Sequence, residues 1–287
     1  MKGSTGKKMS IRAKVLLDSI TEGQKYRLTT LEVVIPRVVL CEFNTHRALS
    51  RNSASSRAIP VEKMIRQVEE DPYIPIHWGQ NQKGMSATSE IADLSKCLAD
   101  EDWLGVRDFT VSQVKKLIDL GVHKQVANRL LEPFMWQTII VSATDWENFF
   151  ALRDNQSASP EMQETARSIR RAIDGSTPYI VPYTSKGEWH MPFITEAEYE
   201  LFDDRDLMKI SVGRCARVSY LTHDGKRDPG EDIRLHDRLL ESGHMSPFEH
   251  IARPSMWFDR HTSNFTGWTQ YRKLIPNEAC HVIQQQQ

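Results

Sequence analysis

The stretch from residue 38 to residue 57, VVLCEFNTHRALSRNSASSR, constrains this chain more than any other part of it. An apolar, β-branched run passes directly into a segment of almost entirely polar side chains. These polar residues are His46, Arg47, Ser50, Asn52, Ser55, Ser56 and Arg57. Arginine forks and serine hydroxyls match the oxygens of phosphate groups, so the segment suits an anionic ligand. We predict a binding loop at the mouth of a strand and not a core element; the alternative is a solvated polar turn.

Composition describes an ordinary globular protein. The 287 residues suffice for one large domain or two modest ones. The 37 Lys and Arg nearly balance the 38 Asp and Glu, so no overall field favours a nucleic-acid polymer or a membrane surface. No apolar run approaches the roughly 18 residues of a membrane span, and the lysine-rich start lacks a signal-peptide core. We expect a cytoplasmic protein with a disordered tail over residues 1–10 and a single domain over residues 11–287.

The cysteines argue against a metal or redox centre. Cys41, Cys97, Cys215 and Cys280 lie far apart and form no C-x-x-C pair. We predict reduced, mostly buried thiols and no metal site, because no H-E-x-x-H spacing occurs either. Cys280 and His281 are adjacent, which invites a nucleophile interpretation, but nothing near them in the sequence would activate the thiol, so we treat the pair as structural.

The hydrophobic pattern predicts one strand followed by helices. Residues 29–43 read as a strand with Pro36 at an edge or bulge. Residues 71–90 look like a long loop, and from about residue 90 to about residue 173 the spacing of apolar residues is helical throughout. Residues 174–195 form a turn-rich connector. The individual helices are expected over residues 60–70, 103–122 and 123–131, from Asp145, from Ser159, from Thr195, over 206–222, and over 232–243, where Gly243 ends the last one.

Two further segments carry groups suited to chemistry. His244, Ser246 and Glu249 cluster in HMSPFEH, residues 244–250, just past a helix end; the alternative is that such a histidine only caps or packs. Asn148 and Arg153 lie roughly 140° apart around one helix and share a broad polar flank at best. A solvated arginine is the alternative there, as it is for Arg129. The sequence has no G-x-S-x-G, G-x-G-x-x-G or Walker loop, so hydrolase, Rossmann and P-loop functions lack their motifs.

Together these stretches resemble the flavin-dependent thymidylate synthase family. Its best marker is RHRxxSxNxxSxRY, and residues 45–58 read THRALSRNSASSRA. The match includes His46, Arg47, Ser50, Asn52, Ser55 and Arg57. GHMSPFEH is similar to the family's second marker, and ARVSY, residues 216–220, resembles the stretch that normally precedes it. GVHKQVANRLLEP and ENFFALRDNQSASPEMQ resemble the helices that carry the family's nucleotide-binding arginines.

The order and some residues depart from the family pattern. ARVSY and GHMSPFEH normally precede the RHR stretch, whereas here they follow it, as expected for a circular permutation joined near residues 174–195. Thr45 replaces the first Arg of the marker, Ser53 replaces Glu or Gln, and Ala58 replaces Tyr. Ser159-Pro160-Glu161 stands where the family tends to have Ala-Gln-x-Glu. The loss of Arg at position 45 removes one cation from the phosphate contacts of the flavin or the nucleotide.

The resemblance implies a fold and a reaction. The fold would be α/β of the α+β type, a mostly antiparallel sheet with packed helices, assembled as a homotetramer with active sites where subunits meet. The reaction would transfer a one-carbon unit from methylenetetrahydrofolate to C5 of dUMP, giving dTMP. FAD would carry the hydride, NADPH would be the reductant, and the protein would supply orientation and electrostatics.

The resemblance also implies roles for individual residues. Arg153 would lie against O2 and N3 of the pyrimidine, where a fixed cation stabilises developing negative charge. Substrate contacts would come from Glu42, Ser55, Ser56, Arg57, Arg129 and Arg153. Cofactor contacts would come from His46, Arg47, Asn52, Asn148, Ser246 and Glu249. The catalytic set would be Arg153, Ser55 and His244, and His244 and Glu249 would face the flavin ring and the folate.

Two alternatives stay open. A hydroxymethyltransferase would hydrate the same exocyclic methylene and give 5-hydroxymethyl-dUMP or 5-hydroxymethyl-dCMP; Glu42, where the family often has Gln, favours this alternative. A catalytically inactive nucleotide- or RNA-binding homologue is the other, suggested by Thr45 and Ala58.

Overall fold

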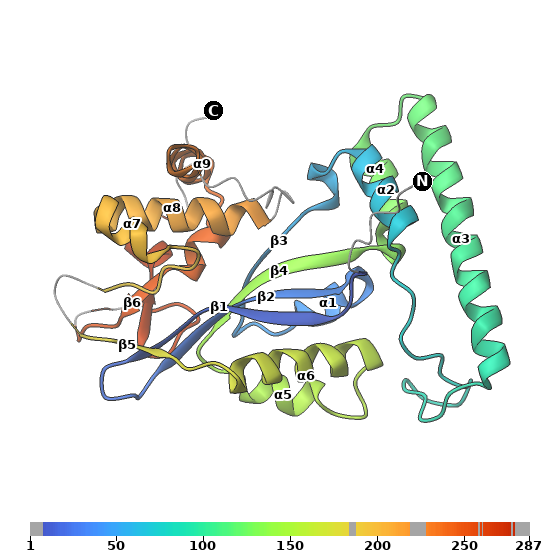
Figure 1. Ribbon diagram of the computed structural model, residues 1–287, viewed down its shortest axis with the longest axis horizontal. Coiled ribbons are helices and arrows are strands. Elements are labelled where there is room, and N and C mark those ends of the chain that lie inside the picture. Colours follow the sequence, from blue (N-terminus) through green and yellow to red (C-terminus); the bar gives the residue numbers. More distant parts are fainter. Residues whose placement is uncertain are drawn as a thin grey trace.

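A five-stranded sheet forms the centre of the protein. The structure is a computed structural model and describes residues 8–183, 188–218, 228–257, 259, 261–276 and 278. Its strands are β1 (Arg12–Thr21), β2 (Arg27–Pro36), β3 (Ser50–Ser53), β4 (Trp136–Ala143), β5 (Tyr179–Val181), β6 (Ala252–Pro254) and β7 (Trp268–Gln270). The central sheet has the order β3-β4-β2-β1-β5, and β5 alone of these described strands runs parallel to its neighbour (Figure 1). The predicted mostly antiparallel sheet with packed helices is confirmed.

The helices agree largely with the sequence pattern. The α-helices are α1 (Leu40–Phe43), α2 (Val61–Glu70), α3 (Asp93–Asp119), α4 (Lys124–Ala127), α5 (Glu147–Arg153), α6 (Pro160–Asp174), α7 (Glu196–Leu201), α8 (Asp204–Arg217) and α9 (Pro229–Glu241). The 3-10 helices are η1 (Arg37–Val39), η2 (Ser56–Ala58), η3 (Asn128–Phe134), η5 (Ser246–His250) and η6 (Tyr271–Leu274). The predicted cap at Thr195 is a full capping box with Glu198. The run predicted over residues 123–131 is two short pieces, α4 and η3.

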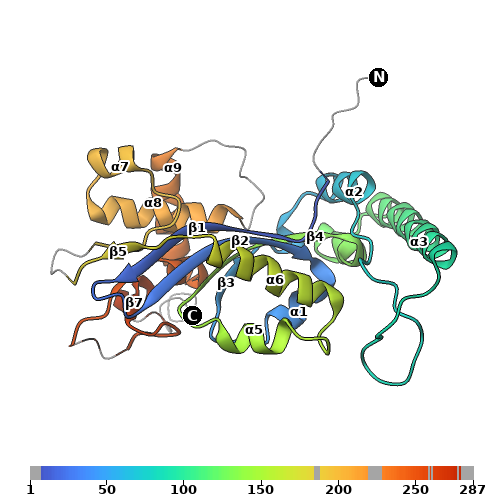
Figure 2. The ribbon, with the colours of Figure 1, turned by 60° about the horizontal axis from the view of Figure 1, so that its bottom comes forward.

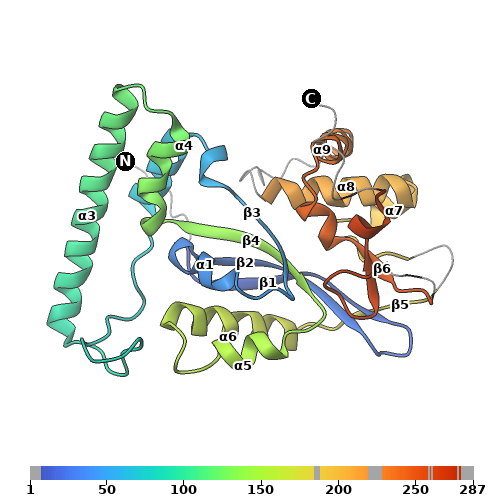
Figure 3. The same ribbon diagram turned by 180° about the vertical axis from the view of Figure 1, so that it is seen from behind.

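Three groups of helices pack around the central sheet. α5 and α6 cover one face, where Leu31, Val33 and Ile35 of β2 meet Met162 and Ala166 of α6 (Figures 1 and 2). α2, α3 and η3 build a second cluster at one end of the molecule, and α8, α9 and η5 build a third at the other end (Figure 3). No helix among the described residues is long and apolar enough to cross a membrane.

The strand predicted over residues 29–43 ends earlier than expected. β2 stops at Pro36, and residues 37–43 form η1 and α1. Proline cannot donate a ladder hydrogen bond, so it is a natural last residue of a strand. The apolar residues that follow are buried from a helix instead: Val39 and Phe43 join the cluster under α6. The prediction of an extended conformation was therefore wrong beyond residue 36.

The prediction of continuous helix from residue 90 to residue 173 was wrong at β4. Trp136–Ala143 is a strand that lies between β2 and β3, and its run from Ile139 to Ala143 is buried. A short apolar run that is buried on both faces has no amphipathic period, so spacing alone does not separate it from a buried helix. The β-branched residues Thr138, Ile139, Ile140 and Val141 carried the missed signal.

The polar stretch is partly a strand of the sheet, against the prediction that it would stay outside the core. β3 pairs with β4, and Ser50 and Asn52 are buried. Their polar atoms are satisfied: Gln270 Nε2 donates to Ser50 Oγ at 2.8 Å, and Asn52 Nδ2 donates to the carbonyl of Cys215 at 2.8 Å. Burial of polar groups is tolerated when each has such a partner.

Several sequence predictions fall outside the described residues. These are residues 1–7 of the tail, residues 184–187 of the connector, Ser219 and Tyr220 of ARVSY, and the pair Cys280 and His281. In the described part of the connector, β5 is a strand beside β1, which corrects the purely turn-rich expectation. Of the other cysteines only Cys215 is buried, whereas Cys41 and Cys97 are exposed, so the prediction of mostly buried thiols was wrong for these two. The single-domain assignment stays a prediction.

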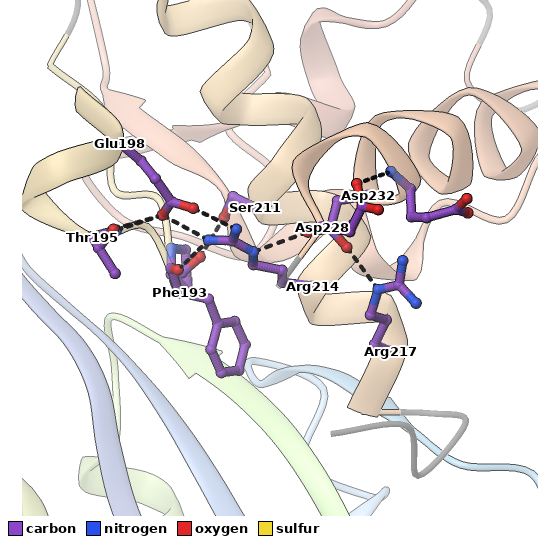
Figure 4. A network of polar contacts seen from close by, with 10 residues as sticks. Phe193, Thr195, Glu198, Ser211, Arg214, Arg217, Asp228 and Asp232 are labelled. Atoms are coloured by element: carbon purple, nitrogen blue, oxygen red, sulfur yellow. Dashed lines mark hydrogen bonds and ion pairs between the residues drawn. The ribbon is translucent and has the colours of Figure 1, made fainter. Parts of the chain in front are cut away.

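A buried ion network holds α7, α8 and α9 together. Arg214 is 4% exposed and donates to both carboxylate oxygens of Glu198, to Asp232 Oδ2 at 3.0 Å and to the carbonyl of Phe193 (Figure 4). Arg217 donates to the second oxygen of Asp232. Hydrogen bonds from Arg214 lower the pKa of Glu198 to about 2. Each buried charge thus has a partner, which is the condition under which such burial is stable.

Gly213 allows α8 and α9 to approach this closely. A Cβ at this position would lie 2.5 Å from the carbonyl oxygen of Asp232, which is backbone and has little room to move. We expect Gly213→Ala to lower the free energy of unfolding by about 1–3 kcal/mol or more, the range for overpacking. Gly105 in α3 has nothing within 4 Å of its Cβ position, so Gly105→Ala is the matched control. It should stabilise by about 0.5–1 kcal/mol, and urea unfolding of both variants tests the pair. Equal effects in the two variants would contradict this packing.

A buried hydrogen-bond chain attaches the C-terminal part to the sheet. It runs Ser19, His190, Thr30, Ser142, His250, with successive polar atoms 2.6–2.8 Å apart. All of these side chains are fully buried. The first, third and fourth lie on β1, β2 and β4, and the two histidines belong to the segment after residue 188. Burial lowers the pKa of both His190 and His250 to about 3.

These histidines should make the fold sensitive to acid. Their folded pKa values lie below the ordinary value near 6.5, so the unfolded chain binds more protons between about pH 3 and pH 6.5. Stability is fully present above pH 6.5 and falls as the pH is lowered through that window, by up to about 1.4 kcal/mol per pH unit for each histidine. Urea unfolding across this range measures the slope. His250→Asn should reduce it, and the exposed His261→Asn should not; identical slopes in all three proteins would refute this origin.

Candidate functional site

Two cavities gather most of the residues that the motifs indicated. The first, of about 450 Å³, is here called the β3 cavity and is lined by polar side chains of Asn52, Ser55, Arg57, His123, His244 and Ser246. The second, of about 270 Å³, is here called the α5 cavity and is lined by Thr45, His46, Arg47, Asn148 and Arg153. The RHR-like stretch contributes to both cavities.

The β3 cavity forms where the two sequence markers meet. Asn52 lies on β3 and donates from Nδ2 to the carbonyl of Cys215 in α8. Its Oδ1 accepts a hydrogen bond from Ser246 Oγ of η5 at 3.4 Å, across 194 residues of sequence. Asn52 therefore fixes the position of the second marker against the first, and the expected proximity of these residues is observed.

The Ser55-Ser56-Arg57 turn presents only two of its side chains to the β3 cavity. Ser55 and Arg57 line it, whereas Ser56 is buried and donates to Glu132 Oε1 at 2.5 Å. Arg129 is exposed on η3 and lines neither cavity. The structure thus brings Ser55 and Arg57 together and does not bring Ser56 or Arg129 to them.

The second marker divides in a similar way. His244 follows Gly243, whose positive φ of 71° ends α9, and its ring lines the β3 cavity. Its Nδ1 lies 2.7 Å from Ser242 Oγ. Glu249 does not line either cavity, because its carboxylate forms an ion pair with Arg272 at 2.5 Å.

Arg153 lines the α5 cavity, and several hydrogen bonds and one ion pair fix its guanidinium group. It is the last residue of α5, and its Nε donates to His46 Nε2 at 2.7 Å. Its Nη1 pairs with the carboxylate of Glu42, and its Nη2 donates to Thr45 Oγ1 at 3.3 Å. Glu42 also accepts from Ser159 Oγ at 3.2 Å. These bonds fix the plane of the guanidinium, and Thr45 takes part at the position where the family marker has an arginine.

His46 stays neutral beside Arg153. Its side chain is buried, and the pKa of His46 is lowered first by that burial and then by the charges of Arg153 and Arg51. A neutral ring whose Nε2 accepts from Arg153 carries its proton on Nδ1. His46 therefore orients Arg153 as a hydrogen-bond acceptor and adds no positive charge.

The donor set of the α5 cavity fits a phosphate-bearing cofactor. Arg47 and Asn148 are exposed and line the cavity with Arg153, so two guanidinium groups and an amide face one space, with one carboxylate, Asp145, among the other lining residues. Guanidinium forks match phosphate oxygens, and amides complete such sites. No group of three or more His, Cys, Asp or Glu in the described part of the chain could hold a metal ion.

Two residues that line the β3 cavity were not predicted from the sequence. His123 and Gln125, at the start of α4, face the β3 cavity. They lie in GVHKQVANRLLEP, the stretch that resembles a nucleotide-binding helix of the family, and that resemblance was the available signal. The residue predicted from this stretch was Arg129. In the structure, the start of the stretch lines the cavity instead.

Comparison with known proteins identifies the family. A family model described as thymidylate synthase complementing protein matches residues 24–179, more than half of the chain. The chain belongs to this family, the flavin-dependent thymidylate synthases, as the motifs predicted. The match includes the RHR-like stretch and ends before ARVSY and GHMSPFEH, so the permuted order stays a prediction. No curated protein matches the sequence.

One solved structure with a similar fold is a UMP/dUMP methylase, PolB from Streptomyces cacaoi, bound with 5-Br UMP. The similarity has a TM-score of 0.47 at 13% sequence identity and covers 57% of this chain and 88% of that chain.

Removal of the Arg153 charge should change the pKa of the neighbouring His46. We expect Arg153→Met to raise the pKa of His46, because one of the charges that lower it is lost while the burial remains. Titration of the histidine signals by NMR measures the change. Arg171 forms an exposed ion pair with Glu164 and does not act on His46, so Arg171→Met is the control. An unchanged pKa of His46 in Arg153→Met would contradict the contact between the two side chains.

Proposed function

We propose that this protein transfers a one-carbon unit from methylenetetrahydrofolate to C5 of dUMP, with FAD as cofactor and NADPH as reductant. The observation that supports it is the convergence of both family markers on one cavity, through the hydrogen bond between Ser246 and Asn52. A family assignment alone would not require residues so far apart in sequence to meet.

The nucleotide would occupy the β3 cavity. Its volume of about 450 Å³ lies in the range of small-ligand pockets. Arg57 is exposed and has no ion-pair partner within the described residues, so it can receive a phosphate group without breaking an existing contact. Ser55 adds a hydroxyl at the same wall.

Arg153 would act on the base. A cation beside O2 and N3 of a pyrimidine favours the electron-rich, N3-deprotonated form, in which C5 is the nucleophile. Glu42 and His46 hold the guanidinium before a ligand arrives, so little reorganisation is needed when the base binds. No protein nucleophile is needed for this role.

FAD would be held by the residues that fit its phosphates and polar edges. These are His46, Arg47, Asn52, Asn148 and Ser246, from the walls of both cavities. When bound, FAD supplies hydride transfer, the chemistry that side chains do not provide. The residues of this chain would bind and orient the cofactor.

The proposed site residues are divided between two cavities, which supports an active site shared between subunits. Arg57 and His244 line one cavity and Arg153 lines the other. A homotetramer in which a partner subunit brings its α5 cavity to the β3 cavity of this chain would complete the set. Size-exclusion chromatography with light scattering measures the oligomer directly.

A product assay tests the function. Purified protein should show flavin absorbance near about 450 nm after addition of FAD. With dUMP, methylenetetrahydrofolate and NADPH it should form dTMP, as measured by mass spectrometry, and the reaction should depend on NADPH. Arg153→Ala should lower kcat by about 100-fold or more, the cost of losing an electrostatic contact of this kind. Arg171→Ala, on the exposed face of α6, is the control.

A second candidate is hydroxymethylation of dCMP. The observation that favours it is the carboxylate of Glu42, which forms an ion pair with Arg153, the residue proposed to contact the base. A carboxylate accepts hydrogen bonds from the amino group of cytosine, whereas uracil presents a carbonyl oxygen there. Formation of 5-hydroxymethyl-dCMP or 5-hydroxymethyl-dUMP without NADPH would support this candidate and rule out the first. Nucleotide binding without any flavin absorbance or product would indicate an inactive homologue.

A further inference from the structure

Two histidines, His123 and His244, line the β3 cavity, and their hydrogen bonds give them opposite tautomers. His123 is the N-cap of α4, and its Nδ1 accepts the backbone N–H of Gln125 at 3.3 Å. A neutral ring whose Nδ1 accepts must carry its proton on Nε2. His123 therefore presents a donor, Nε2–H, on the side of the ring that faces away from its own helix.

His244 has the reverse arrangement. The single proton of Ser242 Oγ is directed to the carbonyl of Arg238 at 2.8 Å, so this oxygen accepts from His244 Nδ1 at 2.7 Å. In the neutral ring the remaining nitrogen, Nε2, is then an acceptor. The lining of the cavity thus includes one donor histidine, His123, and one acceptor histidine, His244.

The donor histidine lines the cavity together with the cation Arg57. His123, Gln125 and Arg57 all line the β3 cavity. The turn that carries Arg57 is tied to the segment that carries His123: Asn128 Nδ2 donates to the carbonyls of Ser56 and Ile59 at 2.8 and 2.9 Å. Lys124 Nζ donates to the carbonyl of Ala58 at 3.3 Å. The backbone on both sides of Arg57 is therefore fixed relative to His123.

Ala58 leaves this wall open. It lines the cavity with a methyl group at the position where the family marker has a tyrosine. A small side chain there leaves room for a ligand group to reach the ring of His123. A guanidinium and an imidazole N–H on one rigid wall form a donor set for a tetrahedral anion.

We infer that His123 is a positioning residue that donates its Nε2–H to the phosphate of the bound nucleotide, beside Arg57. This inference rests on the proposed function for the identity of the nucleotide. The hydroxyl of Ser246 and the acceptor nitrogen of His244, which also line the cavity, are left for the rest of the ligand.

Two substitutions separate the capping role of His123 from the ligand contact. Asparagine is among the best N-cap residues, so His123→Asn keeps the bond to Gln125 and removes the Nε2 donor. His123→Gln places an amide donor close to the position of Nε2. Calorimetry on the full chain with dUMP and with deoxyuridine, which lacks only the phosphate, reads the contact directly.

We expect His123→Asn to weaken dUMP binding about tenfold or more, as loss of a hydrogen bond to a charged group does, and to leave deoxyuridine binding within about twofold of wild type. His123→Gln should recover most of the dUMP affinity. His261→Asn, an exposed histidine that does not line the cavity, should bind both ligands as the wild type does. Unchanged dUMP binding in His123→Asn, an equal loss for deoxyuridine, or no recovery in His123→Gln would overturn the inference.

The same titrations keep this inference apart from the proposed function. If dAMP binds as tightly as dUMP, the proposed pyrimidine substrate is wrong, but the effect of His123→Asn on both monophosphates still tests the phosphate contact. A wild-type protein that binds no monophosphate overturns the inference, whereas the product assay decides the function. Long-range ¹H–¹⁵N spectra of the ligand-free protein should show His123 protonated on Nε2 and His244 on Nδ1, and the opposite tautomer of His123 would also overturn it.

Discussion

The attachment of the C-terminal segment to the sheet is the interaction on which the rest of this structure depends. Thr30 and Ser142 project from neighbouring central strands, and His190 and His250 reach them from outside the sheet. The contact is made of neutral hydrogen bonds in a dry interior, where each bond is strong and each missing partner is costly. Because η5 ends at His250, the same contact places Ser246 and the wall of the β3 cavity.

Charge is treated differently in the scaffold and in the cavities. In the scaffold the buried Arg214 has two carboxylate partners, Glu198 and Asp232. In the cavities the balance is incomplete: Arg153 has Glu42, but Arg57 has no such partner within the described residues. An arginine without a carboxylate beside uncharged donors is available for an external anion, which is the property that a phosphate site needs.

The sequence predicted which residues come together better than it predicted the fold around them. The markers identified Asn52, Ser55, Arg57, His244 and Ser246 because their spacing is specific, and the structure brings these residues together. β4 escaped because a buried central strand has no polar face to give a period. β3 escaped for the opposite reason: its polar residues are satisfied by Gln270 and by Cys215, partners more than 160 positions away that local pattern does not reveal. His123 was missed because capping residues are common and usually have no further role.

The polar composition of β3 has a consequence for how the chain is made. Ser50 and Asn52 are covered by residues from α8 and from β7, which leave the ribosome long after β3 and β4 have been synthesised. Until then β3 is an unprotected edge of a growing sheet, and an apolar edge in that position would pair with other chains. Serine, arginine and asparagine side chains keep this edge hydrated until α8 and β7 have been synthesised. Of these strand residues, Asn52 and Ser53 line the β3 cavity in the folded chain, so the polar side chains that line the cavity also disfavour aggregation of the nascent sheet.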